Sequence, residues 1–211
     1  MTGRLDNEHI LVTGGGRGIG SAIVEKCLLE GANVSFIDLM GEEARSLNNK
    51  LNQDNKLLFE EGNVCSVEDL KRWCDASRKK FGAITGLVNN AGINSYADPG
   101  TMTEQQWEDV FDVDLKAAWL TAREVLPDMI ANKKSSIVNI ASVHANMTYP
   151  SMFPYAAAKS GLVGLTRSMA LEVGAHQVRV NALSPGSVSY THLRAHETRE
   201  DRVCRLLLEK K

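Results

Sequence analysis

The sequence lacks a long apolar run, a large charge of either sign and any clustered cysteines. No apolar run approaches the ~20 residues of a membrane-spanning helix, so we expect no membrane association. The net charge of −2 predicts no surface for nucleic acid. The four cysteines show no C-x-x-C spacing and no neighbouring ligand cluster, which predicts reduced thiols and no metal site. The short polar segment 1–9 is typical of neither a signal peptide nor a transit peptide, so a cytoplasmic protein is expected.

The composition that is present is that of an ordinary folded domain. The chain has 211 residues, of which 43% are apolar and 24% charged, enough for one domain with a real core. Strand-like and helix-like patterns alternate from residue 9 to residue 186, which predicts an α/β fold with a parallel sheet covered on both faces. Strands are predicted at 9–13, 33–38, 57–62, 84–89, 135–141 and 177–183, and helices at 19–30, 41–52, 66–81, 104–132 and 155–174.

A glycine-rich turn, TGGGRGIG at 13–20, separates the first predicted strand from the first predicted helix. Glycines let the backbone approach an anion, and the helix N-terminus supplies free N–H groups and a partial positive charge. The turn therefore indicates either a bound diphosphate or only a tight turn in an ordinary strand–helix unit. Asp38 ends the next predicted strand 18 positions after Gly20. This spacing is near the ~20 expected for a carboxylate that binds an adenosine ribose, which favours a dinucleotide.

A second group of polar residues follows the fifth predicted strand. Ser142 ends that strand, at the sheet edge where parallel sheets bind ligands. Tyr155 and Lys159 follow, four residues and about one helical turn apart, in a helix that Pro154 can introduce. Because a nearby ammonium favours phenolate, Lys159 is expected to lower the pKa of Tyr155 toward the range of a general base. The alternative is an exposed pair on the first turn of a helix.

Together, the spacing of Gly14, Gly18 and Gly20, the NNAG sequence at 89–92 and the Ser142, Tyr155 and Lys159 set resemble the short-chain dehydrogenase/reductase family. The resemblance implies a Rossmann-type, doubly wound parallel sheet in a three-layer α/β/α single domain, which forms homodimers or homotetramers. It also implies hydride transfer between NAD(P)(H) and a secondary alcohol or ketone. Tyr155 would be the general acid/base, Ser142 would hydrogen-bond the substrate oxygen, and Lys159 would bind the nicotinamide ribose. The implied dinucleotide contacts are Thr13, Gly14, Gly16, Arg17, Gly18, Ile19, Gly20, Asp38, Asn63, Val64, Asn90, Ala91, Gly92, Tyr155, Lys159, Pro185 and Gly186.

The sequence departs from the family pattern at two positions. Asn63 stands where the family usually has an aspartate near the adenine ring, and an amide can also hydrogen-bond adenine. Asp114 lies on the apolar face of the predicted helix 104–132, where the family usually has an asparagine that holds a water of the proton relay. Because an unpaired buried charge costs several kcal/mol, Asp114 is interpreted either as a catalytic residue or as a structural buried acid.

The cofactor preference depends on two residues of opposite charge. Asp38 would accept a hydrogen bond from the ribose 2′-hydroxyl and repel a 2′-phosphate, whereas Arg17 could attract that phosphate. Since Asp38 is followed by Leu39 and not by a basic residue, we expect NAD(H) to be preferred over NADP(H).

The family resemblance ends at Gly186. Relatives continue through a substrate lid, another helix and a seventh strand, whereas VSYTHLRAHET at 188–198 and VCRLLLEKK at 203–211 resemble translated sequencing-adapter DNA. We therefore expect a dinucleotide-binding domain at 1–186 that lacks the usual last helix and strand, and a non-family tail of artefactual origin at 187–211. A genuine divergent C-terminus is the alternative, and the coding DNA across Ser187 would distinguish the two.

Two functions are compatible with these motifs. One is an alcohol/ketone oxidoreductase whose substrate is a 3-oxoacyl thioester, a sugar or a cyclic alcohol. The other is a nucleotide-binding protein without turnover, such as a sensor, which the acidic residue at 114 favours. Candidate substrate-pocket residues are Asn94, Tyr96, His144, Met147, Tyr149, Met152 and Phe153.

Overall fold

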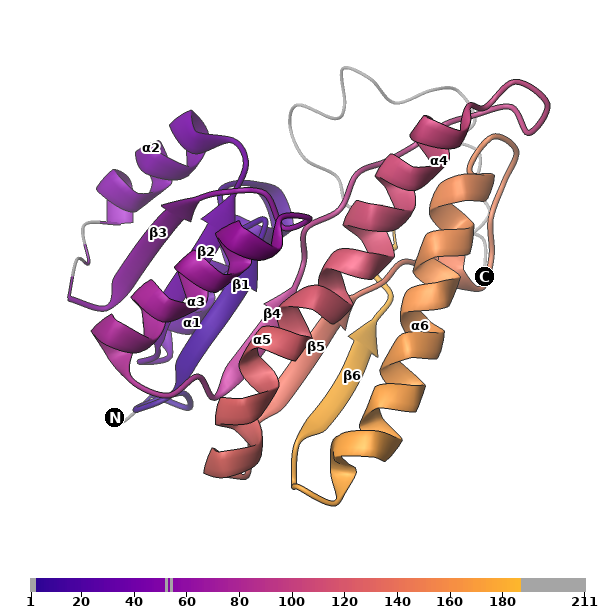
Figure 1. Cartoon of the computed structure of the whole chain (residues 1–211). Helices are drawn as coiled ribbons and strands as arrows, with labels where there is room; N and C mark the ends of the chain where they lie inside the picture. Colours follow the sequence, from indigo (N-terminus) through magenta and orange to yellow (C-terminus); the bar gives the residue numbers. More distant parts are fainter. Residues whose placement is uncertain (1–2, 52, 54, 187–211) are drawn as a thin grey trace, which may run out of the picture.

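The computed structural model describes residues 3–51, 53 and 55–186 (Figure 1). Six parallel strands form one sheet in the order β3-β2-β1-β4-β5-β6, as in a doubly wound Rossmann-type fold. The strands are β1 (His9–Thr13), β2 (Asn33–Asp38), β3 (Leu57–Glu61), β4 (Gly86–Asn89), β5 (Ser136–Ile140) and β6 (Arg179–Leu183). The predicted tail at 187–211 lies outside the described residues, so its origin and the domain boundary at 186 stay predictions.

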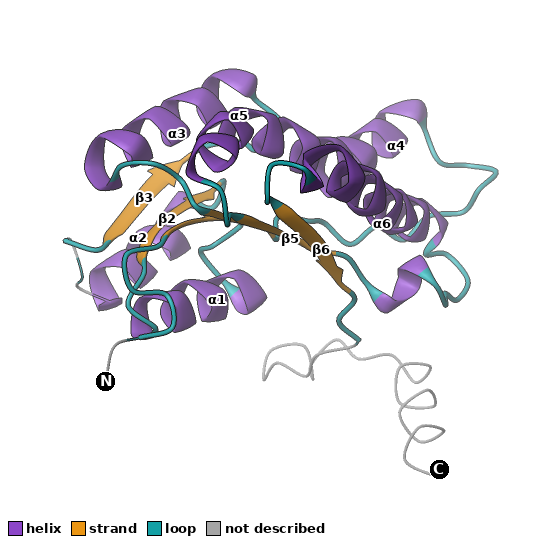
Figure 2. Ribbon diagram, turned by 90° about the horizontal axis from the view of Figure 1, so that it is seen from below, coloured by secondary structure: helices purple, strands orange, loops and turns teal. Residues whose placement is uncertain are grey.

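Helices cover both faces of the sheet, so the predicted three-layer α/β/α fold is confirmed (Figure 2). Helices α1 and α2 lie on one face, and α3, α5 and α6 lie on the other. The helices are α1 (Gly18–Leu29), α2 (Gly41–Leu51), α3 (Val67–Phe81), α4 (Glu104–Phe111), α5 (Ala117–Asn132) and α6 (Phe153–Gly174). Among the described residues, none of these helices has the length and apolar content needed to cross a bilayer.

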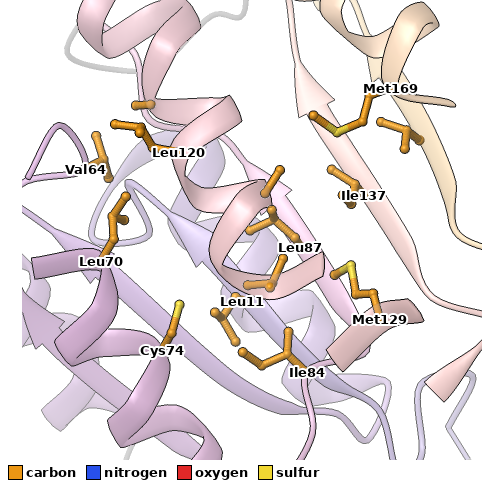
Figure 3. Close-up of a cluster of buried hydrophobic side chains, with 14 of the residues drawn as sticks. Leu11, Val64, Leu70, Cys74, Ile84, Leu87, Leu120, Met129, Ile137 and Met169 are labelled. Atoms are coloured by element: carbon orange, nitrogen blue, oxygen red, sulfur yellow. The ribbon is translucent and has the colours of Figure 1, made fainter. Parts of the chain in front are cut away.

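The sheet separates the two larger of the three core clusters found among the described residues; the third and smallest contains Ala118, Ala141 and Leu162. Successive side chains of β1 point to opposite faces, so Leu11 packs beneath α3 and α5, whereas Val12 packs beneath α1 and α2. Figure 3 shows the first cluster, in which Leu87 and Ile137 from the sheet lie among buried side chains of the covering helices. Burial on both faces explains why β1 and β2, in the middle of the sheet, are buried almost throughout, whereas the edge strand β6 alternates between exposed and buried residues. Burying a leucine or isoleucine side chain completely stabilises the folded state by about 1.5–3 kcal/mol relative to leaving it exposed.

The helical segment 104–132 has the predicted bounds, but a π-helical turn that was not predicted interrupts it. Its start is confirmed, because Thr103 and Gln106 form the predicted capping box. A π-helical turn, η1 (Asp112–Lys116), then separates α4 from α5. Helix α6 packs closely against η1, where a Cβ on Gly161 would lie 2.9 Å from a methyl carbon of Leu115.

Candidate active site

The turn between β1 and α1 has a backbone that requires glycine. Gly14 and Gly18 have φ of +64° and +57°, in the left-handed region where a side chain is strained. A Cβ on Gly20 would lie 1.9 Å from the carbonyl oxygen of Gly14, so α1 can begin here only without a side chain. The N-cap residue Arg17 is exposed, and its side chain accepts no hydrogen bond from the backbone N–H groups that begin α1. The first N–H groups of α1 can therefore face an anion.

Asp38 lies directly beside this turn, at the end of β2. Its Oδ2 accepts a hydrogen bond from the Gly16 N–H (2.8 Å), and its Oδ1 accepts one from the Met40 N–H (2.9 Å). A Cβ on Gly16 would lie 2.9 Å from that same Oδ2. The two hydrogen bonds therefore fix the carboxylate against the glycine turn, while the neighbouring Leu39 is exposed.

The NNAG sequence after β4 connects the turn to the centre of the sheet. Thr13 Oγ1 accepts hydrogen bonds from the backbone N–H groups of Asn90 and Ala91, both at 3.0 Å. The Asn90 side-chain amide donates to the carbonyl oxygens of Thr13 (3.1 Å) and Gly14 (2.9 Å). Asn89 donates to Asn139 on β5 (2.8 Å). Thr13, Asn90 and Ala91 thus hold the ends of β1 and β4 together.

Asn63 and Val64 follow β3. Val64 belongs to the buried core, whereas Asn63 is exposed. The side-chain oxygen of Asn63 accepts a hydrogen bond from the Cys65 N–H (2.9 Å), which leaves its NH₂ group as the donor that could face a base. The arrangement is compatible with an adenine contact but does not require one.

Ser142 and Tyr155 meet at the carboxyl end of β5. Ser142 precedes the short 3₁₀ helix η2 (Val143–Ala145), and its Oγ accepts a hydrogen bond from the His144 N–H (3.2 Å). Tyr155 lies in the first turn of α6, which Pro154 opens as predicted, and its side chain lies close enough to that of Ser142 for the serine hydroxyl to lower the tyrosine pKa. The His144 ring stands edge-on to the Tyr155 ring, with centroids 6.0 Å apart. The structure therefore brings the predicted serine and tyrosine together.

Lys159 lies one helical turn beyond Tyr155, with its Nζ 5.6 Å from the centre of the tyrosine ring. It is 3% exposed, and its Nζ donates to the Ile140 carbonyl (3.2 Å). The same Nζ lies 3.7 Å from Oδ1 of Asp114, which is 1% exposed and is carried by η1. Asp114 Oδ1 also accepts a hydrogen bond from the Ile93 N–H (2.9 Å). The carboxylate at 114 therefore has both a partner and a place in the site.

Gly92 makes room for this ion pair. A Cβ at position 92 would lie 2.7 Å from Asp114 Oδ1 and 3.2 Å from Lys159 Nζ. The other oxygen of Asp114, Oδ2, is buried and has no hydrogen-bond partner among the described residues. Gly92 thus lies beside the ion pair, whereas the NNAG residues before it hold the ends of β1 and β4 together.

Burial shifts the pKa values of Tyr155, Asp114 and Lys159. It raises the pKa of Tyr155; the nearby Ser142 hydroxyl lowers that pKa, and the negative charge of Asp114 raises it further. The predicted lowering of the Tyr155 pKa was wrong, because burial of the phenol has the largest effect and the negative charge of Asp114 acts in the same direction. Burial also raises the pKa of Asp114 to about 6, against the attraction of Lys159, and lowers the pKa of Lys159, against the attraction of Asp114.

The remaining predicted residues lie around this centre. The Pro185 carbonyl accepts a hydrogen bond from the Val143 N–H (3.1 Å), which places 185–186 beside the segment after Ser142. Among the candidate pocket residues, Met152 is buried, whereas Tyr96 and Met147 are largely exposed. Residue-type reasoning missed the Ile93 N–H and the Ile140 carbonyl, because backbone groups carry no signal in the side-chain pattern.

Comparisons with known proteins give the same family. A family model described as short chain dehydrogenase matches residues 8–202. The 2-(S)-hydroxypropyl-CoM dehydrogenase 3 of Xanthobacter autotrophicus is 36% identical over 192 residues, which cover 90% of this chain and 75% of that protein. The 3-oxoacyl-[acyl-carrier-protein] reductase of Thermotoga maritima is 35% identical over 192 residues, which cover 88% and 76%.

A solved structure agrees with these sequence matches. The gluconate 5-dehydrogenase of Burkholderia cenocepacia, in complex with NADP and tartrate, superposes with a TM-score of 0.85 at 29% identity, covering 94% of this chain and 78% of that one. The fold, the family match and the two relatives agree: the chain belongs to the short-chain dehydrogenase family, a family of oxidoreductases.

Proposed function

We propose that this protein transfers a hydride between a nicotinamide dinucleotide and a secondary alcohol or ketone, with Tyr155 as the general acid/base. The observation that carries the proposal is the proximity of the Tyr155 and Ser142 side chains, beside a buried lysine and at the carboxyl end of the sheet. Asn90 joins the glycine turn to the segment after β4, and Gly92 of that segment lies beside Lys159 and Asp114, so dinucleotide and substrate would meet there.

The glycine turn and Asp38 fit the dinucleotide. Open N–H groups at the start of α1 suit a diphosphate, and the fixed carboxylate of Asp38 suits a ribose diol. When bound, the nicotinamide supplies or accepts the hydride. Lys159 would bind its ribose from the tyrosine side of the site.

The residues of the chain would manage the proton. In ketone reduction the Tyr155 hydroxyl donates its proton to the substrate oxygen as that oxygen gains negative charge, and in alcohol oxidation the phenolate accepts the hydroxyl proton. Ser142 would hydrogen-bond the same oxygen and hold it within reach of Tyr155. Because burial raises the pKa of Tyr155, the phenol is protonated at neutral pH and is ready for the reductive direction.

A turnover assay separates the two functions that the sequence left open. NADH absorbance should change with at least one member of a panel of 3-oxoacyl thioesters, sugars and sugar acids, cyclic ketones and small secondary alcohols. Binding of NADH without an absorbance change across the panel would instead support a nucleotide-binding protein without turnover, which the acidic residue at position 114 favours.

Asp38 is expected to determine the cofactor preference. Asp38→Asn should weaken NADH binding by about 10-fold or more, because a hydrogen bond to a charged group contributes about 1.5–3 kcal/mol. The same variant should bind NADPH better than the wild type does, because the 2′-phosphate is no longer repelled. Fluorescence titration with both dinucleotides measures the effect, and Glu43→Gln, an exposed change on α2, is the control. A wild-type preference for NADPH would contradict the assignment.

We also propose that α5 and α6 pair with a second copy of the chain. An open groove of about 470 Å³ between them is lined by Trp119, Leu126, Leu165 and Met169, and Trp119 is 44% exposed. An exposed tryptophan beside apolar neighbours is typical of an interface between subunits. Sedimentation of the purified protein as a monomer at micromolar concentration would contradict this proposal.

A further inference from the structure

The buried ion pair between Asp114 and Lys159 is a feature that the proposed proton transfer does not by itself require. The Lys159 ammonium already has the Ile140 carbonyl as an acceptor. The Ile93 N–H needs a single acceptor, and the side-chain oxygen of an asparagine, which has the same size and shape as aspartate, could supply it. The carboxylate therefore adds a charge to the site without adding a necessary hydrogen bond.

That charge is costly where it lies. Asp114 is 1% exposed, and its Oδ2 is buried without a hydrogen-bond partner among the described residues. A polar atom in that position carries a desolvation penalty that a neutral side chain would reduce. A structural role alone does not account for an acid at position 114, because an amide of equal size would satisfy the same neighbours.

The negative charge of Asp114 affects the ionisation of Tyr155. In the part of the chain that the structure describes, the titratable side chains around the phenol are Lys159 from α6, Asp114 from η1, His144 from η2 and Tyr96 from the segment after β4. With a neutral residue at 114, the phenol would face an uncompensated ammonium. With Asp114 ionised, the positive charge of Lys159 is largely cancelled, and the phenolate gains less stabilisation.

We propose that Asp114 is a positioning residue, which pairs with Lys159 and thereby sets the pH range over which Tyr155 exchanges its proton. This inference rests on the proposed alcohol/ketone chemistry for its meaning in turnover, but the ionisation of Tyr155 can be measured without turnover. The pair moves that range toward alkaline pH. The Tyr155 hydroxyl therefore keeps its proton for ketone reduction at pH values at which it would lose that proton beside an asparagine at 114.

The first experiment compares pH profiles of wild type and Asp114→Asn. In the oxidative direction, kcat/KM rises as Tyr155 loses its proton, and the midpoint of this rise should fall by on the order of one pH unit in the variant, since a unit charge several ångströms away shifts an ionisation by about that amount. Because the pKa of Asp114 is about 6, the two profiles should converge below that pH and separate above it. Asp112→Asn is the matched control, because Asp112 lies in the same turn but is only half-buried and pairs with Lys116 instead of Lys159.

The second experiment follows the ultraviolet absorbance of tyrosinate in the protein alone. Subtracting the titration of a Tyr155→Phe protein isolates the signal of Tyr155, and its midpoint should be lower in Asp114→Asn than in wild type. If Asp114→Asn does not fold, Asp114→Ser provides a second neutral side chain with an oxygen. An unchanged tyrosinate midpoint in a folded neutral variant overturns the inference even if turnover is normal. A shifted midpoint supports it even if the wild type turns over no substrate, in which case only the proposed function fails.

Discussion

Replacing Tyr155 with phenylalanine is expected to lower kcat by about 10²–10⁴-fold, the contribution typical of a positioned general acid/base. The ring remains in place and only the hydroxyl is lost, so the fold and the contact with His144 should persist. Binding of NADH, measured by fluorescence, should change little, because the glycine turn and Asp38 are unaffected. The readout is NADH absorbance with whichever substrate the panel identifies.

The control for this variant is Tyr96→Phe. Tyr96 is 64% exposed, and loss of its hydroxyl should alter kcat far less than loss of the Tyr155 hydroxyl. A Tyr155→Phe protein that keeps more than about a tenth of wild-type kcat would contradict the general acid/base role, which requires at least about 10²-fold.

Lys159→Met is expected to lower the free energy of unfolding by about 3–5 kcal/mol at pH 7–8, because the variant leaves Asp114 as a buried charge without its partner. The loss should shrink as the pH falls. In the folded variant the pKa of Asp114 lies above its unfolded value, so the folded state binds the extra proton and gains stability as pH falls through that pKa. Denaturant unfolding at several pH values measures both effects.

Two further variants make the origin of this loss clear. Lys159→Met/Asp114→Asn should recover much of the stability at neutral pH, because the double change removes the unpaired charge. Lys116→Met, at an exposed lysine of the neighbouring turn, should cost much less. If the double variant is no more stable than Lys159→Met, the loss comes from packing and not from the carboxylate.

The parts of the site that follow from chain order were predictable from the sequence. The glycine turn, Asp38 and Ser142 each end a strand or follow one, and parallel strands bring their carboxyl ends to one edge of the sheet. The spacing of Tyr155 and Lys159 fixes their common face because one helix carries both. The six strands were predicted within two residues of their observed bounds for the same local reasons.

The parts that depend on tertiary packing were not predictable. The π-helical turn differs from an α-helix by a single residue per turn, and the apolar stripe of 104–132 continues through it, so periodicity gives no warning. The contact of Asp114 with Lys159 joins residues on different elements that only α6 packing brings together. The direction of the Tyr155 pKa depends on burial and on that contact, neither of which residue spacing reveals.

The π-helical turn affects the packing of the helices and the position of Asp114 differently. A bulge of this type accommodates one extra residue while the helices on either side keep their apolar faces in phase, and α6 packs against α4, η1 and α5 alike. Shortening 112–116 by one residue would therefore join α4 and α5 into one continuous α-helix and keep most of its packing against α6. The same deletion would move Asp114 away from Lys159, so the proposed effect of Asp114 on Tyr155 depends on the length of a segment that the packing of the helices does not itself fix.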